Sequence, residues 1–157
     1  MPTRRRCDEA ATEVALDKSQ KIDAEKQTRR FEIYQEFLTQ YPEIKSHKHR
    51  KILLHGGIAA HHAGHIPAWK LLVEKMMAKG LLNAIFATST VAAGVDFPAR
   101  TVVVSNADTR GNDGWRSLQA SELQQMTGRA GRRGKDNVGF VVLRRRIFRI
   151  RRKLHNC

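Results

Sequence analysis

The chain has 157 residues, of which 41% are hydrophobic and 28% are charged. This length and composition fit one globular domain with a sizeable core, and they exclude a disordered chain. The net charge is +14, which favours a polyanionic partner, in the first instance nucleic acid. Seven of the basic side chains lie in residues 144–157, so the rest of the chain is only moderately basic.

Two cysteines, Cys7 and Cys157, stand at opposite ends of the chain. Their separation is not typical of a disulfide framework and favours a reducing compartment. We find no apolar run of the roughly 20 residues that a membrane span needs and no signal sequence. We therefore expect a cytoplasmic protein with no membrane partner.

The first part of the chain is predicted to be helical. Apolar residues at helical spacing predict one helix within residues 7–18 and a second within residues 31–42. The polar residues 19–30 between them fit either a helix extension or a loop. Residues 51–60 change to short apolar runs broken by two glycines, a pattern typical of a linker that enters a buried strand.

Helices and strands alternate in the second part. Pro67 suits the first position of a helix, Trp69 begins an apolar set with core spacing, and Gly80 suits the end of that helix. Strands are predicted at residues 84–88, 101–105 and 138–143. Residues 105–115 are expected to form a loop because they are rich in Asn, Asp and Gly. The alternation predicts an α/β domain with a mainly parallel sheet flanked by helices.

Residues 124–134, QQMTGRAGRRG, raise a question of residue choice. Ser121 and Gln124 predict a capping box at the start of a helix that would carry this segment. Glycine in a helix interior costs roughly 1 kcal/mol relative to alanine. Helix formation alone therefore does not explain Gly128 and Gly131. A glycine has no side chain, so these positions would let another surface approach the backbone closely.

One face of this predicted helix would carry polar groups suited to phosphate. At about 100° per residue, Gln125, Arg129 and Arg132 fall on the same side. Guanidinium forks match phosphate oxygens. From spacing alone, a solvated basic face is an equally good interpretation.

The segment resembles motif VI of superfamily 2 helicases, with the pattern Q-x-x-G-R-x-G-R. Residues 87–103, ATSTVAAGVDFPARTVV, resemble motif V of the same superfamily. Residues 59–64, AAHHAG, resemble the His-His-Ala-Gly element of its superkiller-like branch. Residues 2–13 resemble the segment that follows the motif IV strand, whereas residues 14–50 match only loosely.

The resemblance implies a domain organisation. Residues 1–143 would form the second RecA-like domain of a helicase, of the P-loop NTPase type, truncated at its first strand. Residues 144–157 would form a disordered basic tail, since they do not resemble the continuation of the family.

The resemblance also implies two groups of site residues. Those implied near the nucleotide are Gln125, Gly128, Arg129, Arg132, Gly94 and Asp96. Arg132 or Arg129 would act as the arginine finger on the transferred phosphoryl group, and the branch often has Asn at the position of Asp96. Those implied to contact the backbone of a nucleic-acid strand are Thr3, Arg5, His62, Gly64 and Thr88. Backbone contacts give affinity without sequence specificity.

ATP and Mg²⁺ are the cofactors that the family implies. The sequence contains no Walker A motif and no Asp-Glu-x-His/Asp box. A first RecA-like domain, in cis or in trans, would therefore make most of the contacts to ATP and Mg²⁺. The isolated chain is then expected to be inactive. The branch favours single-stranded or unwinding RNA over DNA as the partner. The alternatives are a stand-alone, non-catalytic nucleic-acid-binding module and an inactive gene fragment.

No metal site is expected from the sequence. His61 and His65 stand four residues apart, a spacing that can hold a metal, but no second cluster of ligands completes a site. A phosphate loop ending at Asp136 also fails, because that position needs Ser or Thr.

Overall fold

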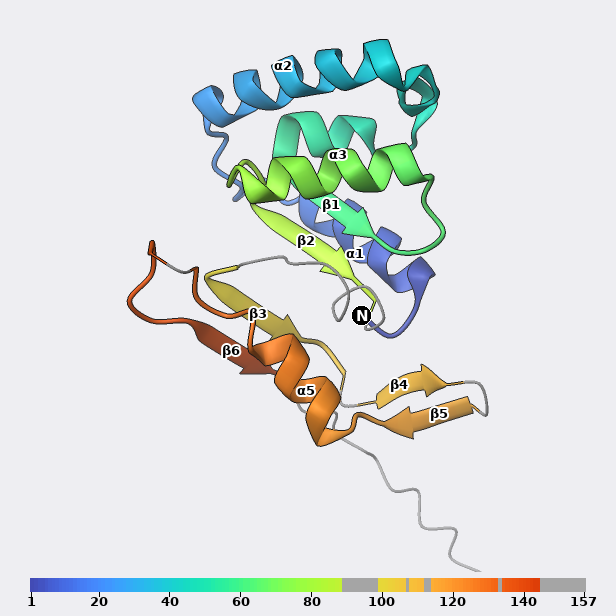
Figure 1. Cartoon of the computed structure of the whole chain (residues 1–157), viewed down its shortest axis with the longest axis vertical. Helices are drawn as coiled ribbons and strands as arrows, with labels where there is room; N and C mark the ends of the chain where they lie inside the picture. The colour runs from blue at the N-terminus through green and yellow to red at the C-terminus, as the bar shows by residue number, and fades with distance from the viewer. Residues whose placement is uncertain (89–98, 107, 112–113, 133, 145–157) are drawn as a thin grey trace, which may run out of the picture.

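Parallel strand pairs covered by helices make up the described chain (Figure 1). The structure is a computed structural model that describes residues 1–88, 99–106, 108–111, 114–132 and 134–144. The parallel pairs are β1 (Ile58–His61) with β2 (Ala84–Ala87), and β3 (Thr101–Val104) with β6 (Phe140–Leu143). An antiparallel hairpin joins β4 (Asp108–Gly111) to β5 (Gly114–Ser117). The α/β class is confirmed, although the described strands form three two-stranded sheets.

Two N-terminal helices begin at side-chain caps. Thr3 Oγ1 accepts from the Arg6 N–H at 3.2 Å and starts α1 (Arg4–Ala15). The Asp23 carboxylate accepts from the Lys26 N–H at 3.0 Å and starts α2 (Ala24–Gln40). A cap satisfies backbone donors that have no partner within the helix. Both predicted helices are confirmed, and part of the polar segment 19–30 proves to be an extension of the second.

The chain then reaches β1 through two short turns. These are a 3₁₀ helix, Pro42–Ser46, and one turn of π-helix, Ile52–Gly56. Every residue of β1 is buried, as predicted for the strand that follows the glycine-broken linker. After it, α3 (Pro67–Ala78) has Pro67 in its first turn and ends before Gly80, which has a φ of 70°. Both residues take the roles that the sequence predicts for them.

The core lies on both faces of the β1–β2 pair. One cluster joins α2 and α3 around Trp69, which is fully buried, as predicted for a core residue. The second joins α1 to the pair and includes Cys7. Figure 1 shows α2 and α3 on one side of β1 and β2, with α1 on the other. Helices on both faces are what a parallel pair of strands requires.

A buried arginine fixes α2 to this core. Arg30 is 1% exposed and donates to the backbone carbonyls of Leu54 at 2.9 Å, Leu81 at 2.9 Å and His55 at 3.0 Å. These carbonyls belong to two segments outside α2, the π-helical turn Ile52–Gly56 and the residue after Gly80, so one side chain holds both segments in place.

Two predictions for the second part were wrong. The expected loop over residues 105–115 contains most of the β4–β5 hairpin, because Asp108–Gly111 pairs with Gly114–Ser117 and the two strands satisfy each other's backbone groups. The helix α5 (Ala120–Thr127) is capped by Gln119 and Glu122 instead of Ser121 and Gln124. The Glu122 carboxylate accepts from the Gln119 N–H at 2.9 Å, so the box lies two residues earlier than predicted.

The C-terminal elements bury little. None of the described residues of α5 is buried, and all four residues of β6 are exposed. None of the helices in the described chain combines the length and the apolar character that crossing a bilayer requires.

Candidate nucleic-acid and nucleotide interface

The carboxyl ends of β1 and β2 bring three parts of the chain to one edge. His61 and Ala87 are the last paired residues of the two strands, so the loop after His61 lies beside Thr88. The Met1 amino group donates to the Ala87 carbonyl at 2.8 Å, which places Thr3 at the same edge. In open α/β sheets, ligands bind outside the carboxyl ends of the strands.

The loop after β1 packs against the first turn of α1. A Cβ added to Gly64 would lie 3.3 Å from Cδ of Arg4 and 3.0 Å from Nδ1 of His62. Glycine at this position therefore allows the close approach of loop and helix. Arg4 and Arg5 are exposed there, and the Arg5 side chain is 87% exposed although it pairs with Glu9 at 2.6 Å. This edge consequently presents guanidinium groups beside exposed backbone.

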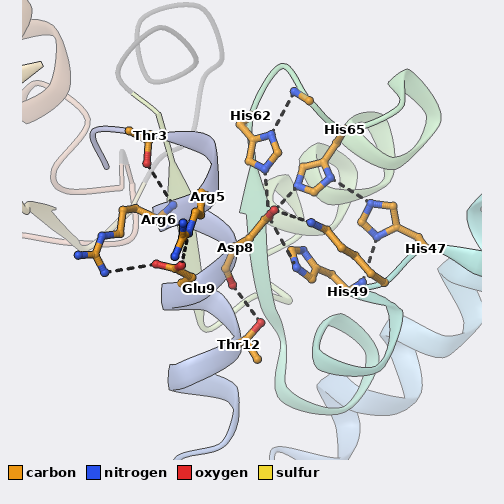
Figure 2. A network of polar contacts seen from close by, with 12 residues as sticks. Thr3, Arg5, Arg6, Asp8, Glu9, Thr12, His47, His49, His62 and His65 are labelled. Carbon is orange, nitrogen blue, oxygen red and sulfur yellow. Dashed lines mark hydrogen bonds and ion pairs between the residues drawn. The ribbon is translucent and has the colours of Figure 1, made fainter. Parts of the chain in front are cut away.

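His62 is buried within this arrangement. Its Nε2 lies 3.0 Å from Oδ1 of Asp8, and its Nδ1 accepts from the Gly64 N–H at 3.1 Å (Figure 2). The residue is 4% exposed. The His62 side chain therefore links the loop to α1, which leaves the loop backbone at residues 63 and 64 as the surface offered to a ligand.

Asp8 is the centre of a polar network that the sequence did not reveal. Its carboxylate accepts from the Lys48 ammonium and from His62, and His49 and His65 approach it at 3.6 and 3.5 Å (Figure 2). Burial raises the pKa of Asp8, but the hydrogen bonds from Lys48 and His62 outweigh it, so this pKa lies below its usual value. Forty residues separate Asp8 from Lys48, and no spacing rule joins them.

Two of the imidazoles in this network, His65 and His47, are neutral at pH 7. Burial lowers the pKa of His65 to about 3 and that of His47 to about 4. His65 stacks on His62 at 3.9 Å, and His47 stacks on Trp69 at 3.6 Å. The network thus connects the ligand-facing edge to the core through stacked rings.

The same residues could be suspected of holding a metal. One ligand atom from each of Asp8, His62 and His65 lies within 4.8 Å of the others. However, His62 Nδ1 accepts from the Gly64 N–H, so the ring proton is on Nε2, the atom that would have to bind the ion. This hydrogen bonding disfavours a metal at the cluster. The His61 and His65 spacing, from which the sequence analysis expected no metal site, does not bring the two rings to one ion either, because His61 Nε2 lies 2.7 Å from Glu74.

The arginine segment does not continue α5 as predicted. The helix ends at Thr127 with Gly128 as its C-cap. Of the three residues predicted to share one helix face, Gln125 is therefore helical, whereas Arg129 and Arg132 lie beyond the helix. Beyond it, the Arg129 carbonyl accepts from the Ala99 N–H at 3.2 Å, and the Gly131 N–H donates to the Ala99 carbonyl at 2.8 Å. The segment therefore pairs with the chain that leads into β3.

Two glycines explain the path of this segment. Gly131 has a φ of 88°, which favours glycine. Gly139 backs directly onto it, because a Cβ on Gly139 would lie 2.5 Å from the carbonyl carbon of Ala130. The close backbone approach that the glycines predict thus occurs between Gly131 and Gly139 of this chain, just before β6.

Arg132 is held by an acidic residue four positions later. Its Nε and a terminal guanidinium nitrogen each donate to Asp136 at 2.8 Å, and its backbone N–H donates at 2.9 Å. The guanidinium beside Asp136 holds the pKa of that carboxyl well below its usual range. The Arg132 side chain is still 40% exposed, so part of its donor fork faces outward.

The two predicted groups lie at opposite ends of the strands. Ala99 precedes β3, so the arginine segment is at the amino end of the β3–β6 pair, whereas Thr3, Gly64 and Thr88 are at the carboxyl end of β1 and β2. Figure 1 shows all four strands pointing in a similar direction. Gly94 and Asp96 lie outside the described residues.

Comparisons with known proteins agree with the sequence motifs. Residues 24–134 match the family described as "Helicase conserved C-terminal domain". The chain is 40% identical over 149 residues to the chloroplastic DExH-box ATP-dependent RNA helicase DExH15 of Arabidopsis thaliana, which covers 92% of this chain and 12% of that protein. It is 45% identical over 91 residues to the antiviral helicase SKI2 of Saccharomyces cerevisiae, covering 58% of this chain and 7% of that protein.

The human exosome RNA helicase MTR4 is a further relative, 45% identical over 91 residues, with 58% of this chain and 9% of that protein covered. The chain therefore spans a small part of the length of each of these relatives.

Proposed function

Because the chain belongs to the helicase C-terminal domain family, in the superkiller-like branch of superfamily 2, we propose that it works as the second RecA-like domain of an ATP-dependent RNA helicase. The relatives named as RNA helicases support RNA over DNA as the partner. In this proposal the domain comprises residues 1–143, and residues 144–157 form a basic tail. A cytoplasmic location stays a prediction from the cysteine content.

The observation that carries the proposal is the edge at the carboxyl ends of β1 and β2. Thr3, Gly64 and Thr88 converge there beside the exposed arginines of α1. We assign this edge to the sugar-phosphate backbone of a single strand. Arg5 supplies charge, and the exposed loop at Gly64, which has no side chain, lets the strand approach closely. Such a surface holds a strand without reading its sequence.

The arginine segment is proposed to face the triphosphate. Guanidiniums, an amide and backbone N–H groups suit phosphate oxygens, so Gln125, Gly128, Arg129 and Arg132 fit the nucleotide. The segment does not fit Mg²⁺, because its one carboxylate, Asp136, is committed to Arg132. When bound, ATP and Mg²⁺ supply the phosphoryl group and neutralise its charge. Asp136 positions Arg132 so that its exposed face is ready for the developing charge.

Strand binding by the chain itself is the first test. We expect Arg5→Ala to weaken binding of a labelled single-stranded RNA about three- to tenfold at low salt, and to reduce the salt slope by about 0.7. Fluorescence anisotropy over a salt series measures both. Arg29→Ala is the matched control, since Arg29 is also exposed and also pairs with a glutamate at 2.6 Å, but on α2. Equal loss in both variants would refute the assignment of this edge.

Catalysis needs the partner domain. We expect no ATP turnover from the chain alone and RNA-stimulated turnover after a separately expressed first RecA-like domain is added. Arg132→Ala should abolish most of this turnover and leave RNA affinity within about twofold, because the arginine segment lies away from the strand-binding edge. Turnover that is unchanged by Arg132→Ala would overturn the arginine-finger role.

A non-catalytic binding module remains the second candidate. The exposed arginines of α1 favour it, because they need no nucleotide to contact a phosphate backbone. Salt-sensitive RNA binding without turnover in the mixture would select this function.

A further inference from the structure

The loop after β1 is a tight turn over residues 62–65 with an exposed tip. The His65 N–H donates to the His62 carbonyl at 3.1 Å and closes the turn. Ala63 and Gly64 at the tip are exposed, whereas His62 and His65 on either side are buried. The two buried histidines therefore flank the backbone that the proposed function assigns to the RNA strand.

Both flanking side chains are directed to one carboxylate of α1. Nε2 of His62 lies 3.0 Å from Oδ1 of Asp8, and Nε2 of His65 lies 3.5 Å from the same oxygen (Figure 2). The two rings stack on each other, with centroids 3.9 Å apart. A single side chain of α1 thus faces both ends of the turn.

Backbone donors determine which ring nitrogens carry protons. The Gly64 N–H donates to Nδ1 of His62, so the proton of this ring is on Nε2. The His49 N–H donates to Nδ1 of His47 at 3.2 Å, so Nε2 of His47 donates to Nδ1 of His65 at 3.0 Å. The proton of His65 is therefore on Nε2 as well. Both rings that flank the turn consequently present an N–H to the same carboxylate oxygen.

An amide could not replace this carboxylate. Oδ2 of Asp8 accepts from the Lys48 ammonium, while Oδ1 faces the rings. An asparagine has one acceptor oxygen and an NH₂ group in place of the second. It would either lose Lys48 or turn its NH₂ group toward Nε2 of His62, which already carries a proton. The turn therefore needs both oxygens of Asp8.

We propose that Asp8 is a positioning residue for RNA binding. It holds His62 and His65, and through them the backbone at Gly64, in the arrangement that contacts the strand. Asp8 itself acts from beneath the surface, because its side chain is 20% exposed and its oxygens face Lys48 and the rings. A turn that is ordered before binding loses less conformational entropy on binding, which raises affinity. The inference rests on the proposed function of this edge.

Two neighbouring acids of α1 give opposite expectations. Glu9 pairs with Arg5 at 2.6 Å and with Arg6 at 3.3 Å. Removing a negative charge beside a phosphate-binding surface favours RNA by itself. We therefore expect Glu9→Gln to leave RNA affinity unchanged or to raise it up to about threefold. Asp8→Asn removes the same charge but should lower the affinity about three- to tenfold, because the turn is no longer held.

Fluorescence anisotropy of the complete chain with a labelled oligouridylate at low salt measures both affinities. A similar rise in both variants would show that Asp8 acts through its charge alone and would overturn the inference, although the strand still binds. A wild-type chain that does not bind the oligonucleotide would refute the proposed function, and the inference with it.

The free chain separates positioning from general destabilisation. In Asp8→Asn, the Gly64 and His65 amides should exchange about tenfold faster, whereas the Leu72 amide in α3 should change only as far as global stability does. Nitrogen-15 spectra of the ring should show that His62 passes from the single Nε2–H tautomer to a mixture. Equal acceleration at all three amides with an unchanged tautomer would show that Asp8 only stabilises the fold, and would overturn the inference.

The wild-type chain supplies a test that does not depend on the folding of a variant. Because linkage is reciprocal, a contact that favours RNA binding must itself be tightened by RNA. Exchange of the His62 Nε2–H proton should therefore slow about three- to tenfold when the oligonucleotide saturates the chain, the same factor as the affinity loss in Asp8→Asn. An unchanged rate with RNA bound would overturn the positioning role.

Discussion

The two regions of the chain are stabilised in different ways. Residues 1–88 enclose two apolar clusters around β1, and Trp69 at their centre is fully buried. Residues 99–144 contain four described strands against two in the first region, but Trp115 is 56% exposed and β6 has no buried residue. Because burial of apolar surface is the main favourable contribution to folding, the first region carries most of the stability.

The second region depends on backbone pairing and ion pairs instead. Arg116 makes two hydrogen bonds to Glu122, which tie the β4–β5 hairpin to α5. Arg132 holds Asp136 across the arginine segment. Exposed ion pairs contribute little to stability. Strands β3 and β6 of the second region have the apolar sequence of strands inside a sheet, but few of their side chains are covered.

The largest effect is expected where the first region is densest. Trp69→Ala should lower the free energy of unfolding by about 3–5 kcal/mol, because it leaves a cavity among fully buried side chains. Phe140→Ala is the control in the second region, where the ring is 49% exposed, and should cost less than about 1 kcal/mol. Urea unfolding followed by far-UV circular dichroism measures both. Similar losses would mean that stability is shared evenly between the regions.

The buried arginine gives the next largest effect. Arg30→Met should destabilise the chain by about 3 kcal/mol, because three carbonyls of the first region lose their donor. Arg29→Met, one residue earlier, breaks an exposed pair with Glu32 and should cost less than about 0.5 kcal/mol. The same urea titration applies. A small loss for Arg30→Met would show that water replaces the guanidinium at these carbonyls.

Lowering the pH should destabilise the first region and leave the ion pair of the second region intact. The folded pKa of His65, about 3, lies below its unfolded value of about 6.5. The unfolded state therefore takes up a proton first, and stability falls as the pH drops below about 6.5, by about 2 kcal/mol at pH 5. The pKa of Glu122 is lowered to about 2 by the hydrogen bond from Arg116, so that pair in the second region stays ionised over the same range.

Thermal unfolding between pH 7 and pH 5 measures this dependence. His65→Phe should reduce it, because the variant has no imidazole to protonate at this position, whereas His47, whose pKa burial lowers to about 4, still contributes. An unchanged slope would show that His65 is already protonated in the folded chain.

The sequence predicted the first region better than the second for a physical reason. Trp69, Pro67 and Gly80 act through local spacing, so helix periodicity and capping rules were sufficient to place them. Asp8 was missed because its partners come from a distant segment. The end of α5 was missed because Gly131 is fixed by Gly139, a contact between two turns that no local rule describes.

The family motifs grouped residues that are distant in the sequence, which helix periodicity cannot do. They brought Thr3, Gly64 and Thr88 together as one group, and the structure places these residues at one edge. Their roles stay predictions. The same motifs did not reveal that His62 is buried against α1, because a motif specifies a residue and not the direction of its side chain.

The smallest effect is expected at the glycine pair of the second region. Gly139→Ala places a Cβ against the Ala130 backbone and should cost about 1 kcal/mol, because this region can shift without disturbing the core. The displaced segment should release the bond between the Gly131 N–H and Ala99, so exchange of this amide should accelerate. Gly134→Ala is the control: its φ of 71° is also strained for alanine, but a Cβ there meets no atom within 4 Å. If both variants accelerate the Gly131 amide equally, backbone strain along the segment, and not its packing against Gly139, holds the arginines in place.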